Sequence, residues 1–87
     1  MSPPHQIAFE FRYDTPALAR TVERSIVQEI GEIEDERSST SVSREGLVLR
    51  ICLEAADLTA LRAAANTWLT LTAVAERTAD KAGVFGS

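Results

Sequence analysis

Residues 47–53 have the sequence LVLRICL, in which every second residue is a large aliphatic one. This period of two places Leu47, Leu49, Ile51 and Leu53 on one face, which is the pattern of a half-buried β-strand. Because it is the most hydrophobic part of the chain, we expect it to be the central strand of a sheet.

Two further segments alternate in the same way. In IAFEFRY at residues 7–13 the inward positions are Ile7, Phe9, Phe11 and Tyr13. In RSSTSVS at residues 37–43, Thr40 and Val42 alternate with serines, which fits either a polar edge strand or a serine-rich linker. We favour the strand, paired in a hairpin with residues 47–53, because polar side chains on an edge discourage indiscriminate pairing.

A first helix is predicted over residues 15–30. The Asp14-Thr15-Pro16 sequence supplies a capping side chain and a proline at the first helical position. Apolar residues then recur one turn apart, at Leu18, Val22, Ile26 and Ile30. Arg20 and Glu23 lie on the opposite face and can pair weakly. Gly31 is placed to end the helix.

A second helix is predicted from residue 58 to about residue 77, with Asp57 as its N-cap. Its polar stripe is narrow: Thr59, Arg62, Asn66, Thr70 and Arg77. One apolar flank holds Leu58, Leu61, Ala65, Trp68 and Leu69, and the other holds Ala60, Ala64, Leu71, Val74 and Ala75. A sheet face covers only about 100° of a helix, so the two flanks together present more apolar surface than the sheet can bury. This surplus favours contact with a partner. The alternative is that the alanines are there only for their helix propensity. Trp68 fits the core and an interface equally well.

Together these elements predict an α+β fold of the type β-α-β-β-α. Chain reversal lets the third strand pair antiparallel with both others, so we expect a three-stranded antiparallel sheet in the order 1-3-2. Short right-handed connections put both helices on one face. The domain is expected over residues 6–78, between a flexible leader at residues 1–5 and a loose tail at residues 79–87.

Composition and charge exclude several function classes. Thirteen acidic against nine basic residues give a net charge of −4, which argues against autonomous nucleic-acid binding. The long apolar run of a membrane span and the basic and apolar regions of an export signal are both missing from the sequence. We therefore expect a soluble cytoplasmic domain that does not contact membranes.

Catalytic and metal-binding residues are scarce. His5 is the single histidine and Cys52 the single cysteine, and we expect Cys52 to be a small packed hydrophobe. Five acids cluster in one connection: Glu29, Glu32, Glu34, Asp35 and Glu36. They lack the spacing of a calcium loop and are typical of a solvated segment. We predict no enzyme activity, no metal and no cofactor.

The segment EAADLTALRAAANTWL at residues 54–69 resembles the signature of the Pcc-type small subunit of the KEOPS (EKC) complex. The shared features are the Ala-x-Asp turn at Asp57, the Leu-Arg-Ala step at Leu61, and Asn66 followed by Trp68 and Leu69. The strand–helix–hairpin–helix order over residues 6–77 is also similar. The resemblance implies a non-catalytic homodimer that binds the threonylcarbamoyl-transferase subunit through its helices and thereby joins two transferase–kinase modules. It also implies support for making threonylcarbamoyladenosine in tRNA, with tRNA contacted only within the assembled complex.

The predicted partner-binding residues lie on the two helices: Leu61, Arg62, Ala65, Asn66, Trp68, Leu69, Arg20 and Glu23. Arg62 and Asn66, one turn apart, would supply directional hydrogen bonds, although Arg62 also fits a local pair with Glu54 or Asp57. The homodimer would form through a sheet edge or through the second helix, and both surfaces stay open at this point.

Two other functions are weaker. A ligand-binding regulatory domain needs glycine-bearing loops at strand ends, for which only Gly31 and Gly46 qualify. A KH-like reader of single-stranded RNA needs a Gly-x-x-Gly clamp and a basic face, and this sequence lacks both.

Overall fold

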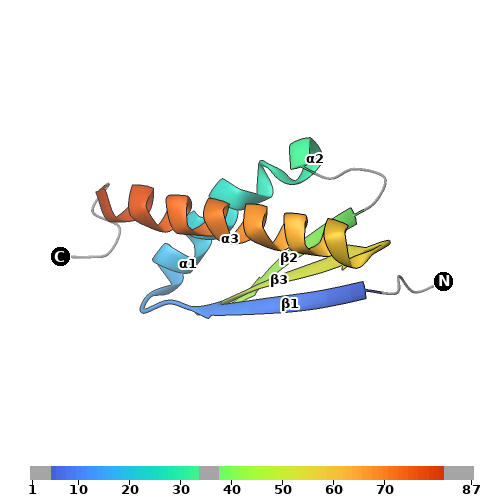
Figure 1. Cartoon of the computed structure of the whole chain (residues 1–87). Helices are drawn as coiled ribbons and strands as arrows, with labels where there is room; N and C mark the ends of the chain where they lie inside the picture. Colours follow the sequence, from blue (N-terminus) through green and yellow to red (C-terminus); the bar gives the residue numbers. More distant parts are fainter. Residues whose placement is uncertain (1–4, 34–37, 82–87) are drawn as a thin grey trace.

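Three antiparallel strands form one sheet in the order β1-β3-β2, in the computed structural model of the chain. The structure describes residues 5–33 and 38–81. The elements follow the order β1 (His5–Arg12), α1 (Pro16–Val27), α2 (Ile30–Ile33), β2 (Ser38–Glu45), β3 (Val48–Ala55) and α3 (Leu58–Lys81) (Figure 1). The predicted α+β class and strand order are confirmed, and so is the interpretation of residues 38–43 as an edge strand rather than a linker, while residue 37 lies outside the described residues.

The core lies between β3 and the helices. The inward residues of β3, Leu49, Ile51 and Leu53, are at most 1% exposed. Ile51 stands opposite Phe9 of β1 on one side and Val42 of β2 on the other, so the three strands contribute to one apolar rung. Because β3 pairs on both sides, it is the central strand that its hydrophobicity predicts.

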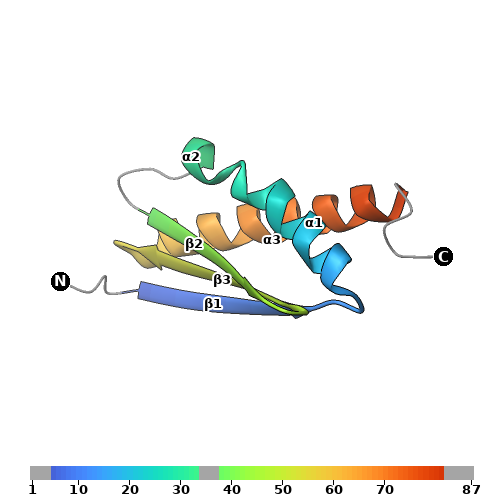
Figure 2. The same ribbon diagram turned by 180° about the vertical axis from the view of Figure 1, so that it is seen from behind.

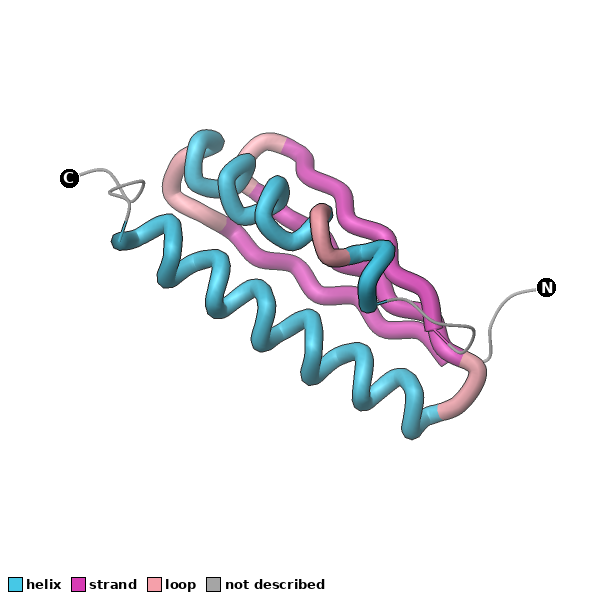
Figure 3. The backbone as a smooth tube through the Cα atoms, turned by 90° about the horizontal axis from the view of Figure 1, so that it is seen from above, coloured by secondary structure: helices cyan, strands magenta, loops and turns pink. Residues whose placement is uncertain are grey.

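Both long helices cover the same face of the sheet (Figures 1 and 2). Viewed from above, α1 and α3 run side by side over the strands (Figure 3). Thr15 caps α1 by accepting a hydrogen bond from the Leu18 amide (3.1 Å). Asp57 caps α3 in the predicted way, because its Oδ1 accepts from the Ala60 amide (2.8 Å).

The prediction for the end of the first helix was wrong. Helix α1 ends at Val27 with Gln28 as its C-cap, and the Glu29 amide donates to the Ile26 carbonyl (3.0 Å) in a tightened last turn. Gly31 lies inside the short α2 rather than after a helix. A left-handed glycine cap needs a positive φ, and among the described glycines only Gly46 has one, at 61° in the β2–β3 turn.

Helix α3 runs past its expected end near residue 77. It continues to Lys81, and Ala79, expected in a loose tail, is 2% exposed. His5, expected in the leader, begins β1. Residues 1–4 and 82–87, together with residues 34–37 of the acidic connection, lie outside the described residues. None of the described helices is long and apolar enough to span a membrane.

Candidate functional site

Helix α3 buries a central stripe and leaves apolar side chains uncovered on both sides of it. The buried residues follow the helical period: Leu61, Ala64, Trp68, Thr72, Ala75 and Ala79. Leu58 and Leu69 remain 48% and 40% exposed on one side, and Val74 remains 43% exposed on the other. The buried stripe therefore takes residues from both predicted flanks. The apolar surface that the fold leaves uncovered lies on both sides of this stripe.

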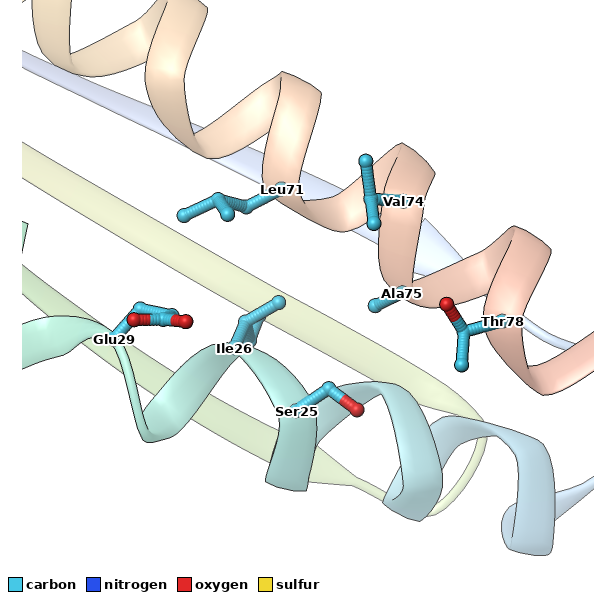
Figure 4. Close-up of a pocket in the computed structure, with 7 residues that line it drawn as sticks. All are labelled: Ser25, Ile26, Glu29, Leu71, Val74, Ala75 and Thr78. Carbon is cyan, nitrogen blue, oxygen red and sulfur yellow. The ribbon is translucent and has the colours of Figure 1, made fainter.

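One side of α3 borders a hollow shared with α1, which we call the α1–α3 groove (Figure 4). Its volume is about 160 Å³, and its lining residues are Ser25, Ile26, Glu29, Leu71, Val74, Ala75 and Thr78. Ile26 and Ala75 are buried and form an apolar floor, while a serine, a threonine and a carboxylate stand at the rim. The groove can receive apolar side chains and offer hydrogen bonds around them.

The other side of α3 faces β1. The Tyr13 hydroxyl at the end of β1 donates to Glu76 Oε2 of α3 (2.7 Å), and helical spacing puts Glu76 on the same side as Leu58 and Leu69. Ile7, which shares a face with Leu53, is 38% exposed on β1. We call Ile7, Leu58, Ala65 and Leu69 the β1-side rim.

Tyr13 is held protonated in this position. Burial of its phenol raises the pKa, and the hydrogen bond and the negative charge of Glu76 raise it further, well above its usual value of 10. Tyr13 is therefore a neutral donor at neutral pH that fixes the end of β1 to α3.

The structure brings some of the predicted partner-binding residues together and separates others. Arg62, Ala65, Asn66 and Leu69 lie on the β1 side of α3, where helical spacing gathers them, and Arg62 and Asn66 are exposed. Trp68 is fully buried, so of its two suggested roles it takes the core one. Leu61 is also in the core at 9% exposure.

The two predicted residues on α1 do not join this group. Arg20 is exposed. Glu23 faces β2, where its Oε1 accepts a hydrogen bond from Arg44 Nε at 2.9 Å and forms an ion pair with it. The partner of Glu23 is thus Arg44, far along the chain, rather than the Arg20 that helical spacing suggested.

Sequence reasoning missed the contribution of α1 to the groove. The apolar lining residues of α3 were part of a predicted flank: Leu71, Val74 and Ala75. The polar lining residues look in the sequence like ordinary solvent-exposed positions: Ser25, Glu29 and Thr78. The available signal was the spacing of Ser25 and Glu29, one turn apart within the helix predicted over residues 15–30, but this spacing is also common on solvated helix faces.

The face of the sheet away from the helices holds Cys52, outside the core in which we expected it. Cys52 is half-buried, and its Sγ accepts from Arg50 Nε (3.4 Å), while Arg50 Nη1 pairs with Glu10 Oε2 (2.8 Å). Among the described residues, no three histidine, cysteine or acidic side chains gather in a way that could hold a metal ion.

Comparison with known proteins identifies the family. Residues 6–80 match the family described as "Transcription factor Pcc1". No curated protein is a significant match. A chain in the crystal structure of the binary complex Gon7-Pcc1 has the same fold, with a TM-score of 0.77 and 15% identity over 91% of this chain and 96% of that chain. Because the family match spans nearly the whole described chain, from β1 to the end of α3, the chain belongs to the Pcc1 family of small KEOPS subunits.

Proposed function

We propose that this chain is a non-catalytic dimerisation and scaffold subunit of the KEOPS complex. It docks the threonylcarbamoyl-transferase subunit with its helices and so supports threonylcarbamoyladenosine modification of tRNA. Membership of the Pcc1 family supports the complex, and the uncovered α1–α3 groove is the observation that carries the docking role. With a net charge of −4, the chain contacts tRNA only where other subunits supply positive charge.

The groove suits a helix of the partner. Two helices already form its walls, and a third helix packs between such walls with apolar residues spaced three and four apart. Val74 and the half-buried Leu71, which both line the groove, would lose their exposed surface on docking. Each Å² of apolar surface removed from water contributes about 25 cal/mol, so a few such side chains give useful affinity. Glu29, Ser25 and Thr78 at the rim orient the partner by hydrogen bonds.

The positions of Cys52 and His5 do not favour a catalytic role in which the cysteine is the nucleophile and the histidine is the base. His5 is in register with Ala55, and its side chain shares the helix-covered face with Ile7. Cys52 is in register with Ala8, one residue out of phase, so it points to the opposite face. A cysteine nucleophile and a histidine base must be within hydrogen-bond reach, and these two are separated by the sheet itself.

The test is capture of the purified transferase subunit by the tagged full-length chain. Val74→Glu places a charge at the groove, and we expect it to weaken capture at least about tenfold, or about 1.4 kcal/mol. Thr70→Glu is the matched control, because Thr70 is exposed one turn earlier on α3 and lies outside the groove. Circular dichroism checks that both variants fold. Equal capture by Val74→Glu and the wild type would remove the groove from the interface.

A further inference from the structure

We infer that Glu29 receives an arginine or lysine side chain from the helix that fills the α1–α3 groove. This charged contact selects the partner helix and sets the direction in which it lies. The inference rests on the docking role contained in the proposed function and names the chemistry of the occupant.

Glu29 stands at one end of the groove, and its backbone is fixed there. Its amide donates to the carbonyl of Ile26 (3.0 Å), which also belongs to the apolar floor. In Figure 4 the Glu29 side chain lies beside Ile26 and across the hollow from Leu71. Thr78 lies at the opposite end. Glu29 is half-buried, so its carboxylate borders apolar surface at one end of the hollow.

The described part of the chain supplies no counter-charge to this carboxylate. The lining of the groove contains no arginine, lysine or histidine. Within residues 5–33 and 38–81, no basic side chain forms an ion pair with Glu29. The neighbouring hydroxyl of Ser25 already donates its hydrogen to the Thr21 carbonyl (3.1 Å), so it can only accept further bonds. We therefore assign the counter-charge to the partner.

Docking changes the surroundings of the Glu29 carboxylate. In the free chain, water solvates its exposed part. A helix that covers Leu71 and Val74 also removes water from the hollow that they share with Glu29. Loss of this water without a new hydrogen-bond donor opposes binding, whereas an arginine or lysine forms a charge-assisted hydrogen bond in its place. A purely apolar helix is therefore disfavoured, and a helix with a basic residue next to its apolar side chains is favoured.

The two ends of the groove differ, and this difference gives the occupant a direction. The carboxylate stands near Leu71, and the hydroxyl of Thr78 stands at the other end (Figure 4). These two residues of α3 are about two helical turns apart, or about 10 Å. This length accepts two apolar side chains one turn apart, with the basic residue following at the Glu29 end. In the reverse direction, the same helix would leave Glu29 covered and unpaired.

The first test measures the dissociation constant between the tagged full-length chain and the purified transferase subunit. Glu29→Gln keeps the shape of the side chain and removes its charge, so we expect binding about tenfold weaker at about 0.1 M salt. The difference from the wild type should narrow at about 1 M salt, where the screening length is about 3 Å. Glu29→Lys brings two like charges together and should weaken binding at least about a hundredfold.

Glu54→Gln is the matched control. Glu54 is also half-buried, and its replacement removes the same charge from the chain. It lies on the face of β3 that points away from the helices, because it is in phase with Cys52. We expect this variant to bind like the wild type at both salt concentrations. Circular dichroism and thermal melts check that every variant folds.

The second test identifies the partner residue by exchanging the charges. Each arginine and lysine on the surface of the transferase subunit is replaced by glutamate in turn, and each variant is mixed with the Glu29→Lys chain. We expect one of these variants to bind Glu29→Lys more tightly than the wild-type transferase does. The same variant should bind the wild-type chain poorly.

The outcomes separate this inference from the proposed function. If Val74→Glu abolishes capture, while Glu29→Gln binds like the wild type and no exchanged charge restores Glu29→Lys, the groove docks the transferase and the inference is overturned. If Val74→Glu leaves capture intact, the groove is not the docking surface, and the inference fails together with it. A loss in Glu54→Gln equal to that in Glu29→Gln would reflect net charge alone and would also overturn the contact at Glu29.

Discussion

The two edges of the sheet have the same backbone and different side chains. β1 and β2 are both eight residues long, and both pair antiparallel with the whole of β3. β1 alternates aromatic and aliphatic residues on its inner face, whereas β2 offers Val42 among serines and Thr40. Two edges with the same hydrogen-bonding pattern therefore differ in the apolar surface that their side chains offer.

A polar pair also ties each edge to a helix, and the two pairs differ in kind. On the β1 side the neutral Tyr13 hydroxyl, in a residue 8% exposed, donates to Glu76. On the β2 side Arg44 forms an ion pair with Glu23, and both side chains are 26% exposed. The Tyr13–Glu76 bond joins a neutral donor to a carboxylate, whereas the Arg44–Glu23 pair joins two opposite charges, so salt should weaken the second pair more.

The largest effect is expected from the inner residues of the two edges. Phe9→Ala should lower the free energy of unfolding by about 2–3 kcal/mol, less than the 3–5 kcal/mol of a fully buried Phe because Phe9 is half-buried. Val42→Ala, on the same rung of β2, should lower it by about 1 kcal/mol. Urea unfolding at a fixed protein concentration measures both. Equal losses would mean that the edges contribute alike and that the comparison fails.

The next effect concerns the Tyr13 tie. Tyr13→Phe removes the bond to Glu76 and should destabilise the fold by about 1–2 kcal/mol. Because the folded-state pKa of Tyr13 lies above the unfolded value near 10, its contribution is complete below that pH and is lost as the pH rises beyond it. Thermal melts should therefore fall more steeply above about pH 10 for the wild type than for Tyr13→Phe. Parallel pH curves would show that the phenol is not held protonated by the fold.

The Arg44 tie should matter less. Arg44→Gln removes the ion pair with a partly exposed Glu23, and such pairs contribute about 0–1 kcal/mol. The difference from the wild type should shrink further in 1 M salt, where the screening length is about 3 Å. A loss that is larger than that of Tyr13→Phe, or independent of salt, would reverse the ranking of the two ties.

The smallest effect on stability is expected on the exposed side of α3. Arg62→Ala together with Asn66→Ala should change the free energy of unfolding by no more than about 0.5 kcal/mol, because both side chains are exposed. If they contact the transferase as predicted from the sequence, capture weakens while the melting temperature stays the same. Unchanged capture would remove Arg62 and Asn66 from the contact with the transferase subunit.

Strands were predictable from the sequence because their signal is local. The alternation of apolar and polar residues in 7–13 and 47–53 can be seen without knowing what packs against them. The strand order then followed from the reversal of chain direction at each connection. The buried stripe of α3 was harder to predict because it includes Thr72, a polar residue. Its hydroxyl donates to the Trp68 carbonyl one turn earlier (2.8 Å), which removes the penalty for burying it. Gly31 led to a wrong helix end for a different reason. A glycine caps a helix only where its backbone is left-handed, and Gly31 lies inside α2 without a positive φ.

The candidate site was only partly predictable for a related reason. Excess apolar surface on α3 could be inferred from one helix alone, and Leu69 and Val74 confirm it by their exposure. The groove depends on how α1 lies beside α3, a distance in space that sequence periodicity does not contain. Likewise, Glu23 could not be assigned to Arg44, because that pair joins residues 21 positions apart.

The central position of β3 has a consequence for amide exchange with deuterated solvent. Successive backbone amides of β3 point alternately to β1 and to β2, so each one has a neighbouring strand to bond to. These amides should exchange more slowly than those of the two edge strands. The Tyr13 amide donates to the Leu47 carbonyl, so the odd-numbered residues of β1 direct their amides toward β3. In an isolated protomer these amides should exchange slowly and the even-numbered ones fast. Protection that extends to Gln6, Ala8, Glu10 and Arg12 would then report, amide by amide, that a neighbouring strand has arrived.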